Sequence, residues 1–244
     1  MCIRDSDYPY QLSTQTTNYQ SVSEVKQLYE EPDSGELARI DWTDGERKHR
    51  YTADLFERPK FLQETTAPTG AEIGQATHLL LQTLDLSEEP TTEKINNTIE
   101  QMIEEELIRE EMIDKIEVNK IINYFQTSFG KRIVQHFKEM EREVLFSLIM
   151  NANEVFLNMD HVEDSILIHG IIDGYFRTED GLVLFDYKTD RVAYLKEAAE
   201  DELIKRYRGQ LLLYKQALET ITKEPVIEAN IISLDLGETI SIFA

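Results

Sequence analysis

Two runs of alternating side chains in the second half of the chain predict a β-hairpin. The runs are Ile168–Phe176 and Leu182–Asp190, and a turn-like segment ending in Asp180-Gly181 separates them. With a period of two, one face of the second run carries Leu182, Leu184, Asp186 and Lys188, and the other carries Val183, Phe185 and Tyr187. Apolar residues on both faces predict a sheet that is covered on two sides.

The remaining pattern predicts helices before the hairpin, and a helix and further strands after it. The expected helices are 21–29, 71–84, 91–114, one or two within 117–140, and 197–221; the expected strands are 141–149, 226–234 and 239–243. Residues 7–20 lack periodicity and are expected to form a linker, and the proline-broken stretch 30–69 a mobile arm. This order predicts an α/β fold, a mixed sheet flanked by helices with an N-terminal helical region.

The hairpin brings two acidic residues together. A loop of two or four residues centred between Glu179 and Asp180 places Asp173 opposite Asp186, with Cβ atoms about 5 Å apart. Like charges so close are destabilising unless a cation lies between them, and oxygen ligands favour Mg²⁺. Lys188 would then lie beside a metal-bound water. The alternative is an ordinary hairpin with its charges in solvent, which the apolar surroundings disfavour.

Three further positions are candidates, each with a plainer explanation. His78 lies on the expected helix 71–84, one turn after Gly74, which permits close approach to a strand; a metal ligand and an ordinary polar helix residue are both open. Tyr207, Gln210 and Tyr214 share one face of the late helix, where a core stripe explains the tyrosines but leaves the amide unexplained. Glu143 is either a strand-end charge or a supporting residue of the metal site.

Composition limits the function classes. With 244 residues, of which 41% are hydrophobic, the chain predicts one globular domain. A net charge of −22 argues that another protein surface delivers any nucleic acid, although a DNA backbone could be tolerated along the basic positions from Lys188 to Arg208. The single cysteine, Cys2, excludes a disulfide framework and favours a cytoplasmic protein, and we see neither a membrane span nor a signal peptide. The absence of GxxxxGK and GxGxxG loops excludes a motor or dinucleotide site of its own.

Residues 1–6 match the translation of a sequencing-library adaptor and are left out of the fold prediction. We therefore expect the tail of a longer gene, with residues 7–20 linking a missing helicase region to a nuclease domain at 21–244.

The combined motifs resemble the RecB-like branch of the PD-(D/E)XK nucleases. They are Gly74 to His78, Gly170 to Asp173, Asp186 to Asp190, and Tyr207 through Gln210 to Tyr214. More closely, Ser21 to Glu24, Arg142-Glu143 and Asp186 to Arg191 are similar to the C-terminal nuclease domain of the AddA/RexA component of AddAB/RexAB ATP-dependent helicase–nucleases.

The resemblance implies a restriction-endonuclease-like core in which His78, Asp173, Asp186 and the carbonyl of Tyr187 hold Mg²⁺. Lys188 would orient or activate the attacking water, and Gln210 and Tyr214 would complete the catalytic site. It also implies a 3′-to-5′ DNA exonuclease that processes double-strand breaks for homologous recombination together with the AddB/RexB component. Two alternatives stay open: a stand-alone RecB-like nuclease and a catalytically inactive nuclease-fold scaffold.

Overall fold

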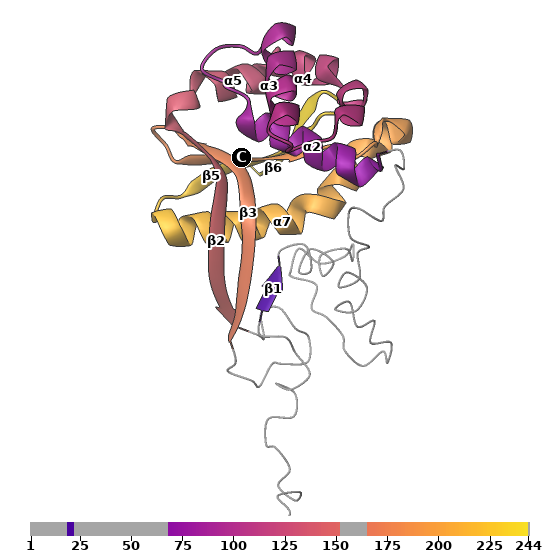
Figure 1. Ribbon diagram of the computed structural model, residues 1–244. Helices are drawn as coiled ribbons and strands as arrows, with labels where there is room; N and C mark the ends of the chain where they lie inside the picture. The colour runs from indigo at the N-terminus through magenta and orange to yellow at the C-terminus, as the bar shows by residue number, and fades with distance from the viewer. Residues whose placement is uncertain (1–18, 22–67, 152–164, 244) are drawn as a thin grey trace, which may run out of the picture.

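The computed structural model describes residues 19–21, 68–151 and 165–243, and this part of the chain forms an α/β fold (Figure 1). Its strands are β1 (Tyr19–Ser21), β2 (Met140–Asn151), β3 (Ser165–Arg177), β4 (Leu182–Lys188), β5 (Val226–Ser233) and β6 (Glu238–Phe243). Its α-helices are α2 (Gly70–Thr83), α3 (Thr92–Glu104), α4 (Val118–Phe125), α5 (Ser128–Gln135) and α7 (Ala199–Thr222). Short 3₁₀ helices are η5 (Glu110–Lys115), η6 (Phe137–Glu139) and η7 (Ala193–Ala198).

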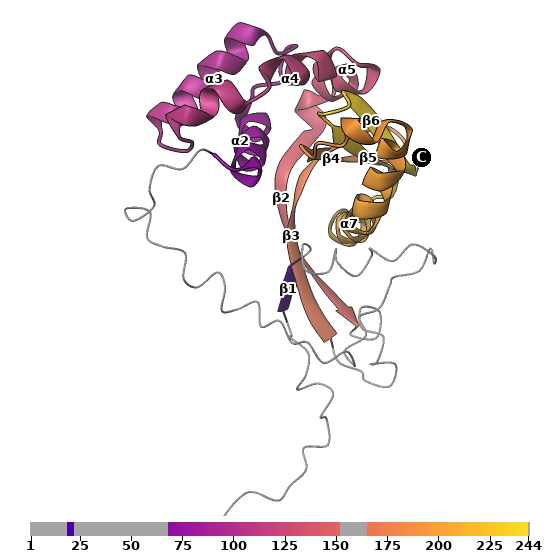
Figure 2. The same cartoon turned by 90° about the vertical axis from the view of Figure 1, so that its right-hand side faces the viewer.

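The described strands form one mixed sheet. Their order is β1-β3-β4-β5-β6, and β2 pairs with β3. The pairs β1–β3 and β4–β5 are parallel, whereas β2–β3, β3–β4 and β5–β6 are antiparallel. Helix α7 connects the parallel strands β4 and β5, and the long β2–β3 ribbon projects from the rest of the sheet (Figure 2). The predicted mixed sheet with flanking helices is therefore confirmed.

The register of the β3–β4 hairpin is the predicted one. Arg177 pairs with Leu182 and Gly174 with Phe185 across a four-residue loop. The ladder ends at Gly174–Phe185, one position before Asp173 and Asp186. Gly174 is required there because a Cβ atom would lie 2.3 Å from the ring of Phe185.

Helices cover both faces of the sheet, with α2 to α5 on one side and α7 on the other (Figure 2). Leu182 and Leu184 pack into the core with α7, whereas Val183, Phe185 and Tyr187 pack into the core formed with α2 to α5. This confirms the predicted alternation along β4. It also confirms a sheet buried on both faces, which is why Asp186 has an apolar environment.

The first described helix is fixed at both ends of its active-site face. Thr69 and Glu72 form a capping box at the start of α2, which saturates backbone donors that a helix start leaves free. Further along, Gly74 approaches the end of β4 so closely that a Cβ atom would lie 2.8 Å from Thr189 Oγ1. The expectation that Gly74 permits close approach of this helix to a strand is confirmed.

Two sequence predictions are wrong. The helix expected over 91–114 ends at Glu104, because Glu106 takes a left-handed conformation (φ 57°) and the Leu107 amide donates to the Met102 carbonyl in a Schellman-type ending. The acidic run at 104–106 places negative charge at the C-terminal end of the helix dipole, which favours that break. The linker expected over 7–20 includes the start of strand β1, whose three residues are too few to show periodicity.

The other predicted elements are confirmed within the described residues, with 117–140 forming the two helices α4 and α5. The helix expected at 21–29 and the arm at 30–69 fall mostly on residues 22–67, outside the described residues, as does Cys2. No helix among the described residues combines the length and hydropathy that crossing a bilayer requires.

Candidate active site

The candidate site lies where the β3–β4 ladder ends. Beyond Gly174 the carboxylate of Asp173 takes over from the ladder, since its Oδ2 accepts a hydrogen bond of 2.8 Å from the Tyr187 amide. Strand β3 also changes face here, because Ile172 is buried with α7 and Phe176 with α2 to α5 although both positions are even. Asp173 therefore lies at a break in the alternation, where groups from both helix layers can meet.

Helix α2 supplies His78 to this point. Its Nδ1 atom lies 3.4 Å from Asp173 Oδ2, and the imidazole is partly exposed. Burial acts to lower the pKa of His78, but the hydrogen bond with Asp173 and the charges of Asp173 and Asp186 outweigh it and raise the pKa. The long-range meeting of Asp173 and His78 follows from the close approach of α2 at Gly74.

Asp186 is the most deeply buried acid of the site, with 2% of its side chain exposed. Burial and the nearby charge of Asp173 raise the pKa of Asp186 to about 6, although Lys188 opposes the shift. Its Oδ2 atom forms an ion pair with Lys188 but has no partner of good hydrogen-bond geometry among the described residues. A buried carboxylate oxygen left in this state is suited to a cationic ligand.

The amine of Lys188 is held from three sides. It contacts Asp186, donates to Gln210 Oε1 at 3.3 Å, and lies 4.2 Å from the centre of the Tyr207 ring. Only 12% of the Lys188 side chain is exposed, so these contacts restrict where the amine can go. The role of Tyr207 as a platform for Lys188 was not apparent in the sequence, where the tyrosine fitted a core stripe.

Helix α7 supplies the other polar partners. Gln210 Nε2 donates to the Tyr214 hydroxyl at 2.6 Å and lies 3.5 Å from Asp186 Oδ1, so the buried amide is fully engaged. Burial, followed by the charge of Asp186, raises the pKa of Tyr214, which keeps its hydroxyl protonated. The amide that a core stripe left unexplained thus contacts both Lys188 and Asp186.

A second support came only from the structure. The Tyr207 hydroxyl donates to Asp190 Oδ2 at 2.6 Å, and Asp190 Oδ1 lies 3.3 Å from Arg206. These contacts fix the ring over which the Lys188 amine lies. The sequence signal was the acidic Asp190 two positions after Lys188, but its partner could be found only once α7 was docked on the sheet.

Glu143 faces the site from β2. The pairs Arg142–Gly174 and Val144–Ile172 leave Glu143 opposite Asp173, and Glu143 takes a left-handed conformation with φ 53°. Burial and the charge of Asp173 raise its pKa. A strained non-glycine residue inside a strand often marks a functional position, so the supporting role of Glu143 gains ground over the strand-end explanation.

The donor set suits a hard divalent cation, although it is not preassembled. The described residues hold no group of three or more acidic, histidine or cysteine side chains already arranged around a common point. They do provide carboxylates from β3 and β4 and an imidazole from α2, with the unsatisfied Asp186 Oδ2 among them. Carboxylate oxygens are the ligands that Mg²⁺ prefers, and their electrostatic coupling here is repulsive without a cation.

Comparison with known proteins agrees with this chemistry. The family model of the PD-(D/E)XK nuclease superfamily matches residues 44–240. The chain is 38% identical to the AddA-type component of the ATP-dependent helicase/nuclease of Levilactobacillus brevis, over 98% of its own length and 19% of the relative. Identity is 41% to the protein of the same name from Limosilactobacillus reuteri, over 95% of the chain and 17% of the relative.

The corresponding protein of Enterococcus faecalis is 38% identical, with 95% of the chain and 19% of the relative covered. The chain spans about a fifth of the length of the curated relatives it matches. Because the superfamily model covers most of its residues, this chain belongs to the PD-(D/E)XK nuclease superfamily.

Proposed function

We propose that the chain is a metal-dependent nuclease that hydrolyses phosphodiester bonds of DNA. The observation that carries the proposal is the buried Asp186 carboxylate, which lies against Lys188 and within electrostatic reach of Asp173 and His78 in a member of a nuclease superfamily. Perturbed, coupled acids beside a restrained amine are what a hydrolytic phosphoryl-transfer site requires.

In this proposal His78, Asp173, Asp186 and the Tyr187 carbonyl hold Mg²⁺. The ion, when bound, would polarise the scissile phosphate and lower the pKa of an attacking water. Support comes from the donor chemistry and from the unsatisfied Asp186 Oδ2 atom. The Tyr187 amide already donates to Asp173, which fixes the peptide whose carbonyl we assign to the ion.

The remaining steps fall to side chains of this chain. Lys188 Nζ, held by Gln210 and by the Tyr207 ring, would orient the attacking water and stabilise the negative charge that develops on the phosphate oxygens. Gln210 and Tyr214 would fix Asp186 and Lys188 relative to each other. Water attacks phosphorus, the bond to the leaving oxygen breaks, and that oxygen takes up a proton from solvent.

The similarity to AddA-type ATP-dependent helicase/nuclease proteins supports a more specific context. We infer that the chain acts as a 3′-to-5′ exonuclease within a helicase–nuclease that processes double-strand breaks for homologous recombination. The net charge of −22 fits delivery of DNA by a helicase region and by the AddB/RexB component of an AddAB/RexAB-type complex. The single cysteine fits work in the reducing cytoplasm.

The test is cleavage of 5′-labelled single-stranded DNA by the 244-residue chain with and without Mg²⁺. We expect products shortened from the 3′ end in Mg²⁺ only, a loss of at least about a hundredfold in Asp186→Ala and Lys188→Ala, and normal activity in Asp201→Ala, an exposed acid on α7. Equal activity in all variants would overturn the assignment. A folded but inactive wild-type chain would favour the inactive scaffold.

A further inference from the structure

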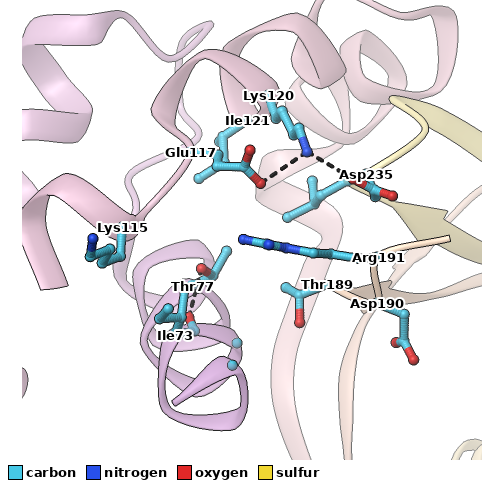
Figure 3. A pocket seen from close by; sticks show the side chains of 13 residues that line it. Ile73, Thr77, Lys115, Glu117, Lys120, Ile121, Thr189, Asp190, Arg191 and Asp235 are labelled. Atoms are coloured by element: carbon cyan, nitrogen blue, oxygen red, sulfur yellow. Dashed lines mark hydrogen bonds and ion pairs between the residues drawn. The ribbon is translucent and has the colours of Figure 1, made fainter. Parts of the chain in front are cut away.

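A pocket of about 350 Å³ opens next to the candidate site and has no assigned role. It lies between the first turns of α2, the start of α4 and the loop that follows β4 (Figure 3). Thr77 lines it directly before His78, and Thr189 lines it directly after Lys188. The pocket and the candidate site therefore share the same two elements, and a strand bound in one can continue into the other.

The acids of the pocket are already neutralised by partners. Asp235 accepts hydrogen bonds of 2.8 Å from the amides of Val192 and Ala193 and pairs with Lys120 at 2.8 Å. Glu117 pairs with the same lysine at 2.9 Å. Asp190, as described above, is engaged by Tyr207 and Arg206. None of these carboxylates needs a further cation.

Two cations of the pocket lack such partners. Arg191 and Lys115 are both exposed, and neither forms an ion pair or a side-chain hydrogen bond with any residue that the structure describes. Figure 3 shows the Arg191 side chain extending across the pocket between Thr77 and Glu117. In a chain with 47 acidic and 25 basic residues, cations left free beside satisfied acids make the pocket locally receptive to an anion.

We propose that this pocket binds a phosphate of the nucleic-acid strand next to the one being cleaved, with Arg191 as the main phosphate ligand and Lys115 as a second contact. The planar guanidinium suits phosphate oxygens, which it can bind through two parallel hydrogen bonds. The inference rests on the proposed nuclease function and adds a substrate-positioning contact to it. It also explains how a strongly acidic chain can hold a strand near its site.

The test measures how single-stranded DNA binding depends on salt. Fluorescence anisotropy with a labelled oligonucleotide in EDTA compares the wild-type chain with Arg191→Gln, Lys115→Gln and Lys131→Gln, the last an exposed lysine on α5 outside the pocket. Losing one phosphate contact should weaken binding about tenfold and reduce the slope of log K against log salt by about 0.7. We expect this in Arg191→Gln, a smaller loss in Lys115→Gln, and wild-type behaviour in Lys131→Gln.

Cleavage kinetics in Mg²⁺ give a second readout. We expect Arg191→Gln to raise KM more than it lowers kcat, because the contact positions the strand away from the reacting atoms. Arg208→Gln removes an exposed arginine from α7, on the other face of the sheet, and should leave KM unchanged. Thermal unfolding checks that each variant is folded.

The outcomes separate the two proposals. If the wild-type chain binds and cleaves DNA but Arg191→Gln matches Lys131→Gln in affinity and slope, the pocket inference is overturned and the nuclease function stands. If Arg208→Gln alone weakens binding, the strand follows α7 and the pocket inference is again overturned. If the folded wild-type chain neither binds nor cleaves DNA, the proposed function fails and the pocket inference fails with it.

Discussion

Asp173 Oδ2 accepts a hydrogen bond of 2.8 Å from the backbone amide of Tyr187, so a carboxylate on β3 replaces the backbone ladder at the point where β3 and β4 stop pairing. The same oxygen lies 3.4 Å from His78 Nδ1. Asp173 therefore has two separable roles, one in holding β4 and one in the chemistry.

Substitutions at Asp173 should separate these roles. Asp173→Ala leaves the Tyr187 amide without its acceptor and should lower the free energy of unfolding by about 1 to 3 kcal/mol. Asp173→Asn keeps an acceptor oxygen and should stay within about 0.5 kcal/mol of the wild type, yet lose nuclease activity because it loses the charge. Urea unfolding and a cleavage assay measure the two effects. Equal stability of the two variants would contradict the structural role.

The buried charge of Asp186 should appear as a pH-dependent stability difference. Its pKa is about 6 in the folded chain, above the value of 3.8 for an unperturbed carboxyl group. Because the folded pKa is raised, protonation stabilises the fold fully below pH 3.8, and this contribution is lost as the pH rises through 6. Asp186→Asn mimics the protonated state at every pH.

In EDTA, Asp186→Asn should therefore gain stability relative to the wild type between about pH 4 and pH 8, by on the order of 2 to 3 kcal/mol. Denaturant unfolding of both proteins at each pH measures the difference. A difference that stays constant over this range would show that Asp186 is not held in a desolvated, repulsive environment.

The aromatic platform under Lys188 should affect catalysis. Tyr207→Leu removes the ring that lies 4.2 Å from the amine and should lower kcat by roughly 2- to 30-fold, corresponding to about 0.5 to 2 kcal/mol. Tyr207→Phe keeps the ring and loses only the hydrogen bond to Asp190, so its kcat should fall less. Single-turnover cleavage rates compare the two; a larger loss in Tyr207→Phe would place the effect in the hydroxyl instead.

The close packing of Gly174 against Phe185 should limit substitution beside the site. In Gly174→Ala, the new Cβ atom meets the aromatic ring and should destabilise the fold by about 1 to 3 kcal/mol. Adding Phe185→Leu removes the ring, so the double variant should lose less than the sum of the two single losses. Strict additivity in urea unfolding would argue against this cross-strand contact.

The hairpin could be predicted because its information is local. The Asp180-Gly181 turn and the alternation of Leu182 to Lys188 specify the register that brings Asp173 close to Asp186. Gly74 likewise pointed to the contact with Thr189. These features depend on spacing and on the absence of a side chain, both of which a sequence displays.

The features that escaped prediction depend on docking of distant segments. Strand β1 is defined by its parallel pairing with Leu167 to His169, far along the chain, and three residues carry no pattern of their own. The contact of Asp190 with Tyr207 requires α7 to lie on the sheet at one particular rotation. The end of α3 was missed because a residue with a side chain, Glu106, takes the left-handed position that glycine usually marks.

The central claim is that Asp173 and Asp186 share one divalent cation, and calorimetric titration of Mg²⁺ and Mn²⁺ into the 244-residue chain tests it most directly. We expect one bound ion per chain in the wild type and in the control Asp201→Ala, with affinity reduced at least about tenfold in both Asp173→Ala and Asp186→Ala. Folded wild-type chain that binds neither metal, or affinities unchanged by removing either aspartate, would contradict the account.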